Sequence, residues 1–197
     1  MAKYHKYVFD HDRRRLIGAF EEMYKAEDRE GFDSWQNNDV RHLRLRLAME
    51  LLRDYNFDSV LELGCGKGTA SQFLKKTNNK VLGVDISPTA IEKAKASYPD
   101  ISFRTMDVMD VDQIGQTFNL TTVMAVLAYI EDWRLLIEKI RGVSEYLMIV
   151  EYIPKDTIGM VKSIDDLNTQ FELYFETKSK LVLNDEVCIL FGERHSA

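Results

Sequence analysis

The amino-acid sequence predicts a doubly wound α/β fold, and three observations support it. From residue 57 onward, short apolar runs rich in β-branched residues alternate with amphipathic helical patterns. Such alternation is typical of a parallel sheet with helices on both faces. Near the end of the chain, two apolar runs joined by Asn184-Asp185 predict an antiparallel hairpin. The first 56 residues have helical rather than strand-like periodicity.

The sheet is predicted to contain five alternating strand–helix units before the hairpin. The expected strands are Ser59–Leu63, Lys80–Val84, Ile101–Met106, Leu120–Leu127, Tyr146–Glu151, Lys180–Leu183 and Val187–Phe191. Between the first five strands and after them, helices are expected near 69–77, 88–98, 132–142 and 163–175. Ser87-Pro88 marks one helix start, because serine caps a helix and proline suits its first position. A sheet of this kind binds ligands at the carboxyl ends of its strands.

Residues 1–56 are expected to form a helical cap, and residues 57–197 the sheet domain. One face of a first helix would hold Leu16, Ile17, Phe20, Met23 and Tyr24. A second helix would begin near Asn38 or Asp39. Its apolar face would hold Val40, Leu43, Leu47, Leu51 and Tyr55.

Charge and composition narrow the class of partner. The 197 residues are 45% hydrophobic and carry a formal net charge of −6. That balance argues against a nucleic-acid partner, which would require a basic face. Eight arginines nevertheless fall in the first 56 residues, at positions 13, 14, 15, 29, 41, 44, 46 and 53. They form either solvated helix faces or a surface for an anionic acceptor.

The two cysteines, Cys65 and Cys188, have neither metal-ligand spacing nor a disulfide framework. We therefore expect no metal and a reducing, cytoplasmic setting. The N-terminus lacks a signal-peptide pattern, and no run of about 18 apolar residues predicts a membrane span. The expected assembly is a monomer or a homodimer.

Three consecutive strand ends carry residues suited to an adenine nucleotide. Gly64-Cys65-Gly66-Lys67-Gly68 ends the first strand, and its glycines let the backbone approach a ligand closely. Asp85 ends the second strand, 21 residues after Gly64, at the spacing where a carboxylate reaches ribose hydroxyls. Asp107 follows the third strand, where its carboxylate would accept a hydrogen bond from the adenine amine. Ile86 and Val108 would sandwich the ring.

The glycine spacing disfavours two common classes of nucleotide-binding loop. A dinucleotide loop requires G-x-G-x-x-G, but here the third glycine comes one residue early, at Gly68. A phosphate-binding Walker loop requires G-K-[ST] after four spacers, which this segment lacks. Glu62, within the same motif, favours a ligand with a positive end. S-adenosylmethionine has this chemistry, since it carries a sulfonium, an ammonium and a single carboxylate.

The motifs resemble those of class I S-adenosylmethionine-dependent methyltransferases. The resemblance covers residues ~57–195 and rests on Leu61–Gly68, Gly83–Ser87, Met106–Val108 and Thr121–Asp132. It implies a seven-stranded sheet with the last strand antiparallel. It also implies Gly64 and Gly66 against the methionine moiety, Asp85 on the ribose and Asp107 near adenine. The full expected cofactor set is Glu62, Gly64, Cys65, Gly66, Asp85, Ile86, Asp107, Val108, Met124 and Trp35.

Two departures from the family and one looser similarity bear on the acceptor. Asn119 replaces a frequent aspartate, and Ala125 stands where many relatives carry a polar residue facing the methyl group. Phe20–Tyr24 and Asp33–Gln36 are similar to segments of small methyltransferases encoded with polysaccharide or nodulation-factor genes. That similarity favours a sugar or nucleotide-sugar acceptor.

Transfer of the methyl group to O or N is an in-line displacement that requires placement, exclusion of water and removal of a proton. The candidate catalytic residues are Tyr129 after the fourth strand, Glu151 at the end of the fifth, and His42 on the second helix. Each also has a structural interpretation: packing for Tyr129 and Glu151, and a solvated helix face for His42.

The sequence predicts a methyltransferase that acts on a small molecule. Two alternatives stay open. One is a partner subunit that binds S-adenosylmethionine without catalysis. The other is an NAD-dependent oxidoreductase, which the early third glycine disfavours.

Overall fold

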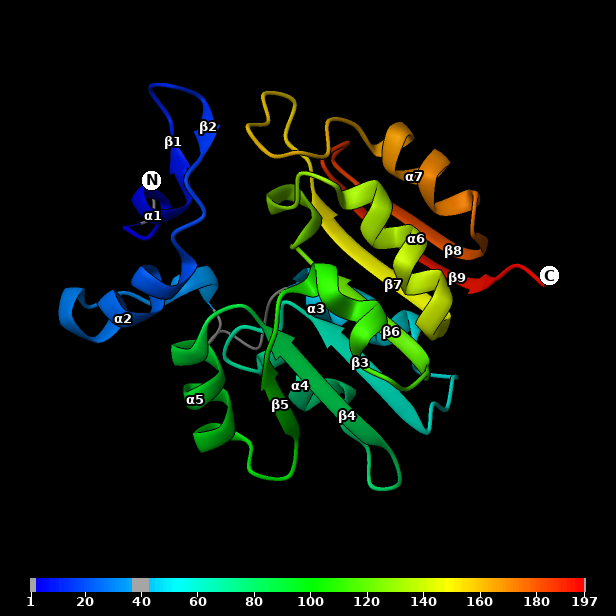
Figure 1. Cartoon of the computed structure of the whole chain (residues 1–197). Helices are drawn as coiled ribbons and strands as arrows, with labels where there is room; N and C mark the ends of the chain where they lie inside the picture. The colour runs from blue at the N-terminus through cyan, green and yellow to red at the C-terminus, as the bar shows by residue number, and fades with distance from the viewer. Residues whose placement is uncertain (1–2, 37–42, 197) are drawn as a thin grey trace.

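A single mixed sheet of seven strands organises the computed structural model, which describes residues 3–36 and 43–196. Its strand order is β5-β4-β3-β6-β7-β9-β8, and only β9 runs antiparallel to its neighbours. The strands are β3 (Ser59–Leu63), β4 (Lys80–Asp85), β5 (Ser102–Thr105), β6 (Phe118–Met124), β7 (Ser144–Tyr152), β8 (Phe175–Leu183) and β9 (Val187–Arg194). The predicted doubly wound sheet with an antiparallel last strand is therefore confirmed (Figure 1).

Helices cover both faces of this sheet, because its strands are apolar on both sides. In β3, Leu61 and Leu63 face one core layer and Val60 faces the other. Helices α6 (Trp133–Val143) and α7 (Ile164–Glu172) pack on the first face. Helices α3 (Leu43–Leu51), α4 (Thr69–Leu74) and α5 (Pro88–Ser97) contribute to the second. The described residues also include the 3-10 helices η1 (Ser34–Gln36), η2 (Val108–Gln113) and η3 (Leu127–Tyr129).

The N-terminal segment is less helical than expected. It contains α1 (His5–Val8), a small hairpin of β1 (Phe9–Asp10) and β2 (Arg15–Leu16), and α2 (Phe20–Glu30). The predicted helical face starting at Leu16 was wrong, because Gly18 has a φ of +69° and interrupts the chain before Phe20. The proposed caps Asn38 and Asp39 lie outside the described residues.

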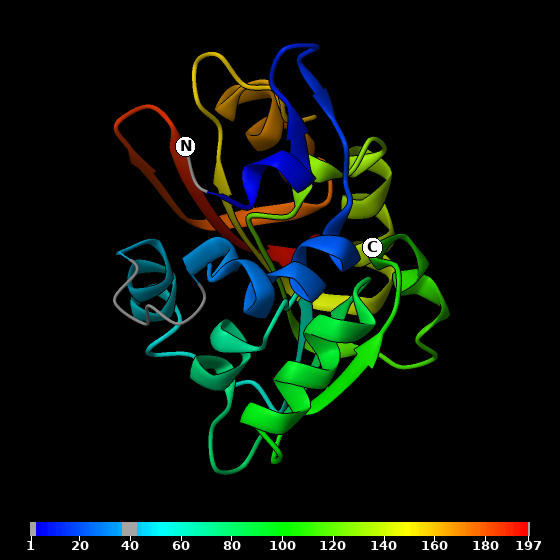
Figure 2. The same cartoon turned by 90° about the vertical axis from the view of Figure 1, so that its left-hand side faces the viewer.

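Helix α2 lies across the carboxyl-end edge of the sheet and packs on α5, as Figure 2 shows. Met23 and Tyr24 of α2 form a buried cluster with Ala90 of α5 and Val8 of α1. The helical elements of residues 3–30 thus cover the sheet edge at which parallel α/β proteins bind ligands.

The closing hairpin confirms the turn predicted at Asn184-Asp185. Both residues have positive φ, +53° and +57°, as a type I′ turn requires. Helix α7, however, ends at Glu172 rather than continuing to residue 175, because Phe175 begins the edge strand β8.

Asp185→Gly should stabilise the protein by about 0.5 to 1 kcal/mol, because glycine adopts positive φ without steric strain. The midpoint of urea denaturation should rise while its slope stays constant. Asp185→Ala, which retains a Cβ at the exposed position, should not produce this gain. An unchanged midpoint for the glycine variant would contradict the assigned turn.

Across residues 3–36 and 43–196, every helix is too short or too polar to cross a membrane.

Candidate functional site

The glycine loop after β3 adopts a conformation that glycine favours. Gly64, Gly66 and Gly68 have φ values of +71°, +52° and +82°. The amides of Gly64 and Cys65 donate to the Val84 carbonyl at 2.8 and 2.9 Å, which fixes the loop to β4. A Cβ at Gly64 would overlap the Val126 side chain, and one at Gly68 would lie 2.7 Å from the Phe103 ring. The loop therefore packs closely against its neighbours and leaves no room for a side chain at Gly64 or Gly68.

Asp85, at the end of β4, connects the glycine loop to the next helix. One carboxylate oxygen accepts from the Gly66 amide at 2.9 Å, and the other accepts from the Ser87 amide at 2.9 Å. Burial raises the pKa of Asp85, and the two amide hydrogen bonds oppose that rise. The structure thus holds a buried carboxylate between the glycine loop and the residues that precede α5.

Glu62 is buried in β3, with only 2% of its surface exposed. The Ser71 hydroxyl donates a hydrogen bond to its carboxylate. Burial raises the pKa of Glu62 to about 8, although the Ser71 hydrogen bond opposes this effect. A cation bound beside this carboxyl would be stabilised by its ionised form.

The strand ends surround a cavity of about 620 Å³. All ten residues expected to hold the cofactor line it: Trp35, Glu62, Gly64, Cys65, Gly66, Asp85, Ile86, Asp107, Val108 and Met124. Ala125 also lines the cavity, with a φ of +56° and its amide donating to the Val150 carbonyl at 2.6 Å. Residues from five strand ends are therefore brought together around one space.

The three candidate catalytic residues have different positions. Tyr129 lines the cavity, whereas Glu151 is buried and is not among the described residues that line it. His42 lies outside the described residues. Burial raises the pKa of Glu151 to about 7, opposed by backbone N–H groups that include those of Leu127 and Ala128. Glu151 thus contacts the start of η3, the turn that carries Tyr129.

Residues 60–145 match a protein family described as a methyltransferase domain. This range contains the glycine loop, Asp85, Asp107 and Tyr129, together with most of the other described residues that line the cavity. Residues 60–145 are therefore similar to a methyltransferase domain.

A curated relative and two solved structures are also similar to this chain. The mitochondrial ubiquinone biosynthesis O-methyltransferase of Schizosaccharomyces pombe is 33% identical over 100 residues, which are 46% of this chain and 36% of the relative. The chain thus spans about a third of that relative's length. The N-methyltransferase NodS from Bradyrhizobium japonicum, in complex with S-adenosyl-L-homocysteine, has a TM-score of 0.70 at 21% identity, covering 88% of this chain and 98% of NodS. The [4+2]-cyclase SpnF has a TM-score of 0.68 at 13% identity, covering 78% and 80% of the two chains. These structures show a shared fold.

The cavity is also lined by residues that the sequence alone did not indicate. Arg44 of α3 is the basic side chain among the described lining residues. It belongs to the group of eight N-terminal arginines, of which Arg13, Arg14, Arg29 and others pair with surface carboxylates. Arg44 has no ion pair with a carboxylate within the described part of the chain. The arginine count was the available signal, but it could not tell which arginine faces inward.

Aromatic rings from the N-terminal segment surround Tyr129 of η3. The ring centroids of Phe9, Phe20 and Trp35 lie 5.7, 5.4 and 5.4 Å from that of Tyr129. Tyr4 lies 5.0 Å from Trp35 and also lines the cavity. The side of the cavity formed by residues 4–35 is therefore largely apolar and aromatic.

Proposed function

We propose that this chain transfers a methyl group from S-adenosylmethionine to an oxygen or nitrogen of a small molecule. The observation that carries this proposal is the match between the cavity's polar groups and that donor. Buried Glu62 suits its ammonium, Asp85 its ribose, and Arg44 its single carboxylate. At Gly64, where a Cβ would overlap Val126, the absence of a side chain suits close contact between the backbone and a ligand.

The adenine end of the donor would lie beyond Asp85. Asp107 starts η2 and accepts a hydrogen bond from the Met109 amide at 2.9 Å, which fixes its carboxylate. A second oxygen is then oriented for the exocyclic amine. Ile86 is 52% exposed beside the cavity, and covering it with an adenine ring would bury apolar surface. Cys65, Val108, Met124 and Trp35 complete the proposed cofactor wall.

S-adenosylmethionine, when bound, supplies an electrophilic methyl group, so the chain's own residues must orient the acceptor and exclude water. We assign these tasks to the aromatic rings of Tyr4, Phe20, Trp35 and Tyr129. Burial raises the pKa of Tyr129 well above its usual value. Tyr129 therefore keeps its proton at neutral pH and orients the acceptor rather than accepting its proton.

Glu151 supports this wall from behind. Its pKa near 7 has the strength of a general base, but the carboxyl lies outside the set of described lining residues. We assign it to holding η3, and hence Tyr129, in place. Residues 1–56 would act as the acceptor-side cover and residues 57–197 as the donor-binding domain.

Incubation with methyl-labelled S-adenosylmethionine and a panel of acceptors tests this proposal. The panel should contain sugars, nucleotide sugars, amines, phenols and carboxylic acids, because the N-terminal sequence similarity favours a sugar while the aromatic wall also suits flat rings. We expect transfer to one class only. Binding of the donor without transfer to any class would favour the second candidate, a partner subunit without catalysis. The [4+2]-cyclase SpnF, with a similar fold, is a reminder that fold does not fix the reaction.

The binding of S-adenosylhomocysteine, which retains the ammonium, should strengthen as pH rises from 5.5 to 7.5. Glu62 has a pKa of about 8 in the free protein and must lose its proton to pair with a cation. Its ionised fraction increases with pH, so affinity should rise by up to about tenfold per pH unit. Titration calorimetry across this range measures the effect.

The matched variant for this experiment is Glu62→Gln. It keeps the shape of the side chain but cannot ionise, so its affinity should be lower and nearly independent of pH. An equal pH dependence in both proteins would assign the titration to another group and remove Glu62 from the ammonium site.

A further inference from the structure

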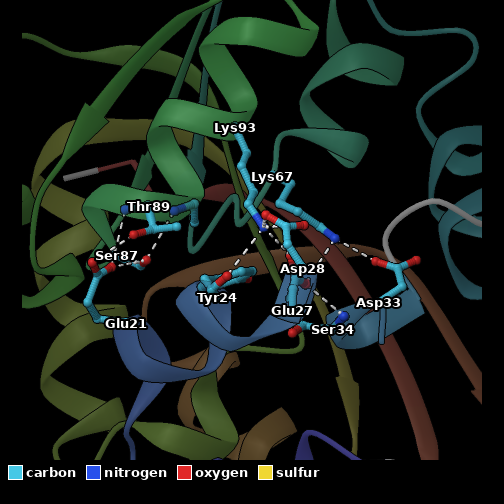
Figure 3. A network of polar contacts seen from close by, with 11 residues as sticks. Glu21, Tyr24, Glu27, Asp28, Asp33, Ser34, Lys67, Ser87, Thr89 and Lys93 are labelled. Atoms are coloured by element: carbon cyan, nitrogen blue, oxygen red, sulfur yellow. Dashed lines mark hydrogen bonds and ion pairs between the residues drawn. The ribbon is translucent and has the colours of Figure 1, made fainter. Parts of the chain in front are cut away.

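Glu27 of α2 lies at the centre of a buried polar network outside the proposed donor contacts (Figure 3). It is only 3% exposed. One of its carboxylate oxygens accepts from Lys67 Nζ at 3.0 Å and from the Ser34 amide at 2.8 Å. The other accepts from Lys93 Nζ at 2.9 Å. A single carboxylate thus connects three separate segments.

Two of these segments carry the proposed donor site. Lys67 belongs to the glycine loop, and its ammonium turns away from the cavity toward Glu27 and Asp33. Lys93 belongs to α5, the helix that follows Asp85. It also pairs with Asp28 at 3.3 Å and donates to the Tyr24 carbonyl at 3.3 Å. Both lysines therefore anchor α2 to the elements that would hold the donor.

The third segment carries a ring of the aromatic wall. Ser34 precedes Trp35 in η1, and its amide hydrogen bond to Glu27 fixes the start of this turn. Trp35 has a φ of +61°, an uncommon backbone conformation for a bulky side chain. Such a conformation persists only where surrounding contacts hold it. Glu27 supplies one of these contacts.

The ionisation of Glu27 is consistent with this role. Burial alone would raise its pKa, but the hydrogen bonds from Lys93, Ser34 and Lys67 outweigh burial and hold the pKa below its usual value. The side chain is therefore charged at neutral pH. Buried pairs of this kind contribute to a defined geometry more than to stability, because the Coulombic gain offsets a large desolvation cost.

A second carboxylate of α2 reinforces the same contact. Glu21 accepts from the Thr89 hydroxyl at 2.8 Å, from the Thr89 amide at 3.2 Å and from the Ser87 hydroxyl. Ser87 is also the residue whose amide donates to Asp85. Helix α2 is thus attached both to Ser87, between β4 and α5, and to Thr89 in the first turn of α5, so its position relative to Asp85 is fixed.

We propose that Glu27 is a positioning residue that holds Trp35 at the cavity in a fixed position relative to the glycine loop. Through Lys67 and Ser34, it joins the acceptor-side cover and the donor-binding loop into one unit. The binding of S-adenosylhomocysteine at the glycine loop should therefore change the surroundings of the Trp35 side chain. This inference rests on the proposed function for its ligand, but the position of Trp35 is testable without any ligand.

The indole N–H resonance of Trp35, measured by two-dimensional NMR, reports its position. The chain has two tryptophans, and Trp35→Phe identifies which signal belongs to Trp35. In the wild type we expect this signal to shift when S-adenosylhomocysteine is added. In Glu27→Gln it should be displaced or broadened before any addition, its response should be lost, and affinity should fall by about tenfold.

Two further variants make this test specific. Glu22→Gln removes a charge from the exposed side of the same helix and should leave the spectrum and affinity unchanged. Lys67→Met removes the contacts of the glycine loop to Glu27 and Asp33 but leaves the hydrogen bond from the Ser34 amide to Glu27, so affinity should fall while the ligand-free Trp35 signal moves less than in Glu27→Gln. If Glu27→Gln does not fold, Lys67→Met is compared with the wild type in its place.

A folded Glu27→Gln protein with wild-type Trp35 signal and affinity would overturn the proposal, even if its melting temperature were lower. A wild-type protein that does not bind S-adenosylhomocysteine would instead contradict the proposed function. In that case a displaced Trp35 signal in Glu27→Gln would still support the positioning role.

Discussion

Replacement of Gly64 by alanine should reduce the binding of S-adenosylhomocysteine by at least about 100-fold, because overpacking at this site forces the loop to move. Gly64 has a φ of +71°, and an added methyl group would overlap Val126, which follows the neighbouring strand β6 and also lines the cavity. The strained backbone and the overlap together should also lower the free energy of unfolding by about 2 to 4 kcal/mol. Calorimetric titration of the folded variant measures the affinity.

Gly31→Ala is the matched control for this prediction. Gly31 ends α2 with a φ of +63°, but a Cβ there would meet no atom within 4 Å. An alanine at this position is strained by the positive φ but overlaps no other atom, so the affinity of Gly31→Ala for the ligand should stay within a fewfold of wild type. If Gly64→Ala bound the ligand as tightly as Gly31→Ala, the glycine loop at Gly64 would not contact the donor.

The second large effect is expected for Asp85→Asn, with a loss of affinity of about 100-fold. An asparagine has a single acceptor oxygen, whereas Asp85 uses both oxygens for the amides of Gly66 and Ser87. One of these amides would then face an NH₂ group, and the charge-assisted contact to the ribose hydroxyls would be lost. Stability should change less than affinity, because the substitution also removes a buried charge whose pKa is raised by burial.

Asp110→Asn provides the comparison for Asp85→Asn. Asp110 lies in η2, is exposed, accepts from Gln113 at 2.8 Å and does not line the cavity. Its substitution removes the same formal charge near the same edge of the sheet. Equal losses in the two variants would indicate a general electrostatic effect and not a ribose contact.

The sheet was predictable because local pattern and tertiary structure agree there. Ser59–Leu63 and the Asn184-Asp185 turn match the predicted positions, since buried parallel strands are continuously apolar and a type I′ turn demands specific residue types. The N-terminal hairpin of β1 and β2 was missed because strands of two residues have no periodicity to read. Gly18 was the available signal for the break before α2.

The donor side of the cavity was predictable for a similar reason: glycines and carboxylates at strand ends meet at one edge in any parallel sheet. The acceptor side depends on which surface of the N-terminal segment turns inward. Arg44 and Tyr4 are placed by packing between segments distant in sequence, and nothing in the local pattern distinguishes Arg44 from Arg46. The lysine at position 67 illustrates the same limit, since its spacing does not reveal its partner Glu27.

We propose that the cavity at the strand ends binds the methyl donor. The decisive experiment is isothermal titration of the wild-type chain with S-adenosylhomocysteine and, separately, with NAD. We predict saturable binding of one S-adenosylhomocysteine per chain and no binding of NAD, since buried Glu62 is unsuited to a pyrophosphate. Binding of NAD without binding of S-adenosylhomocysteine would show that the cavity is not a site for the methyl donor.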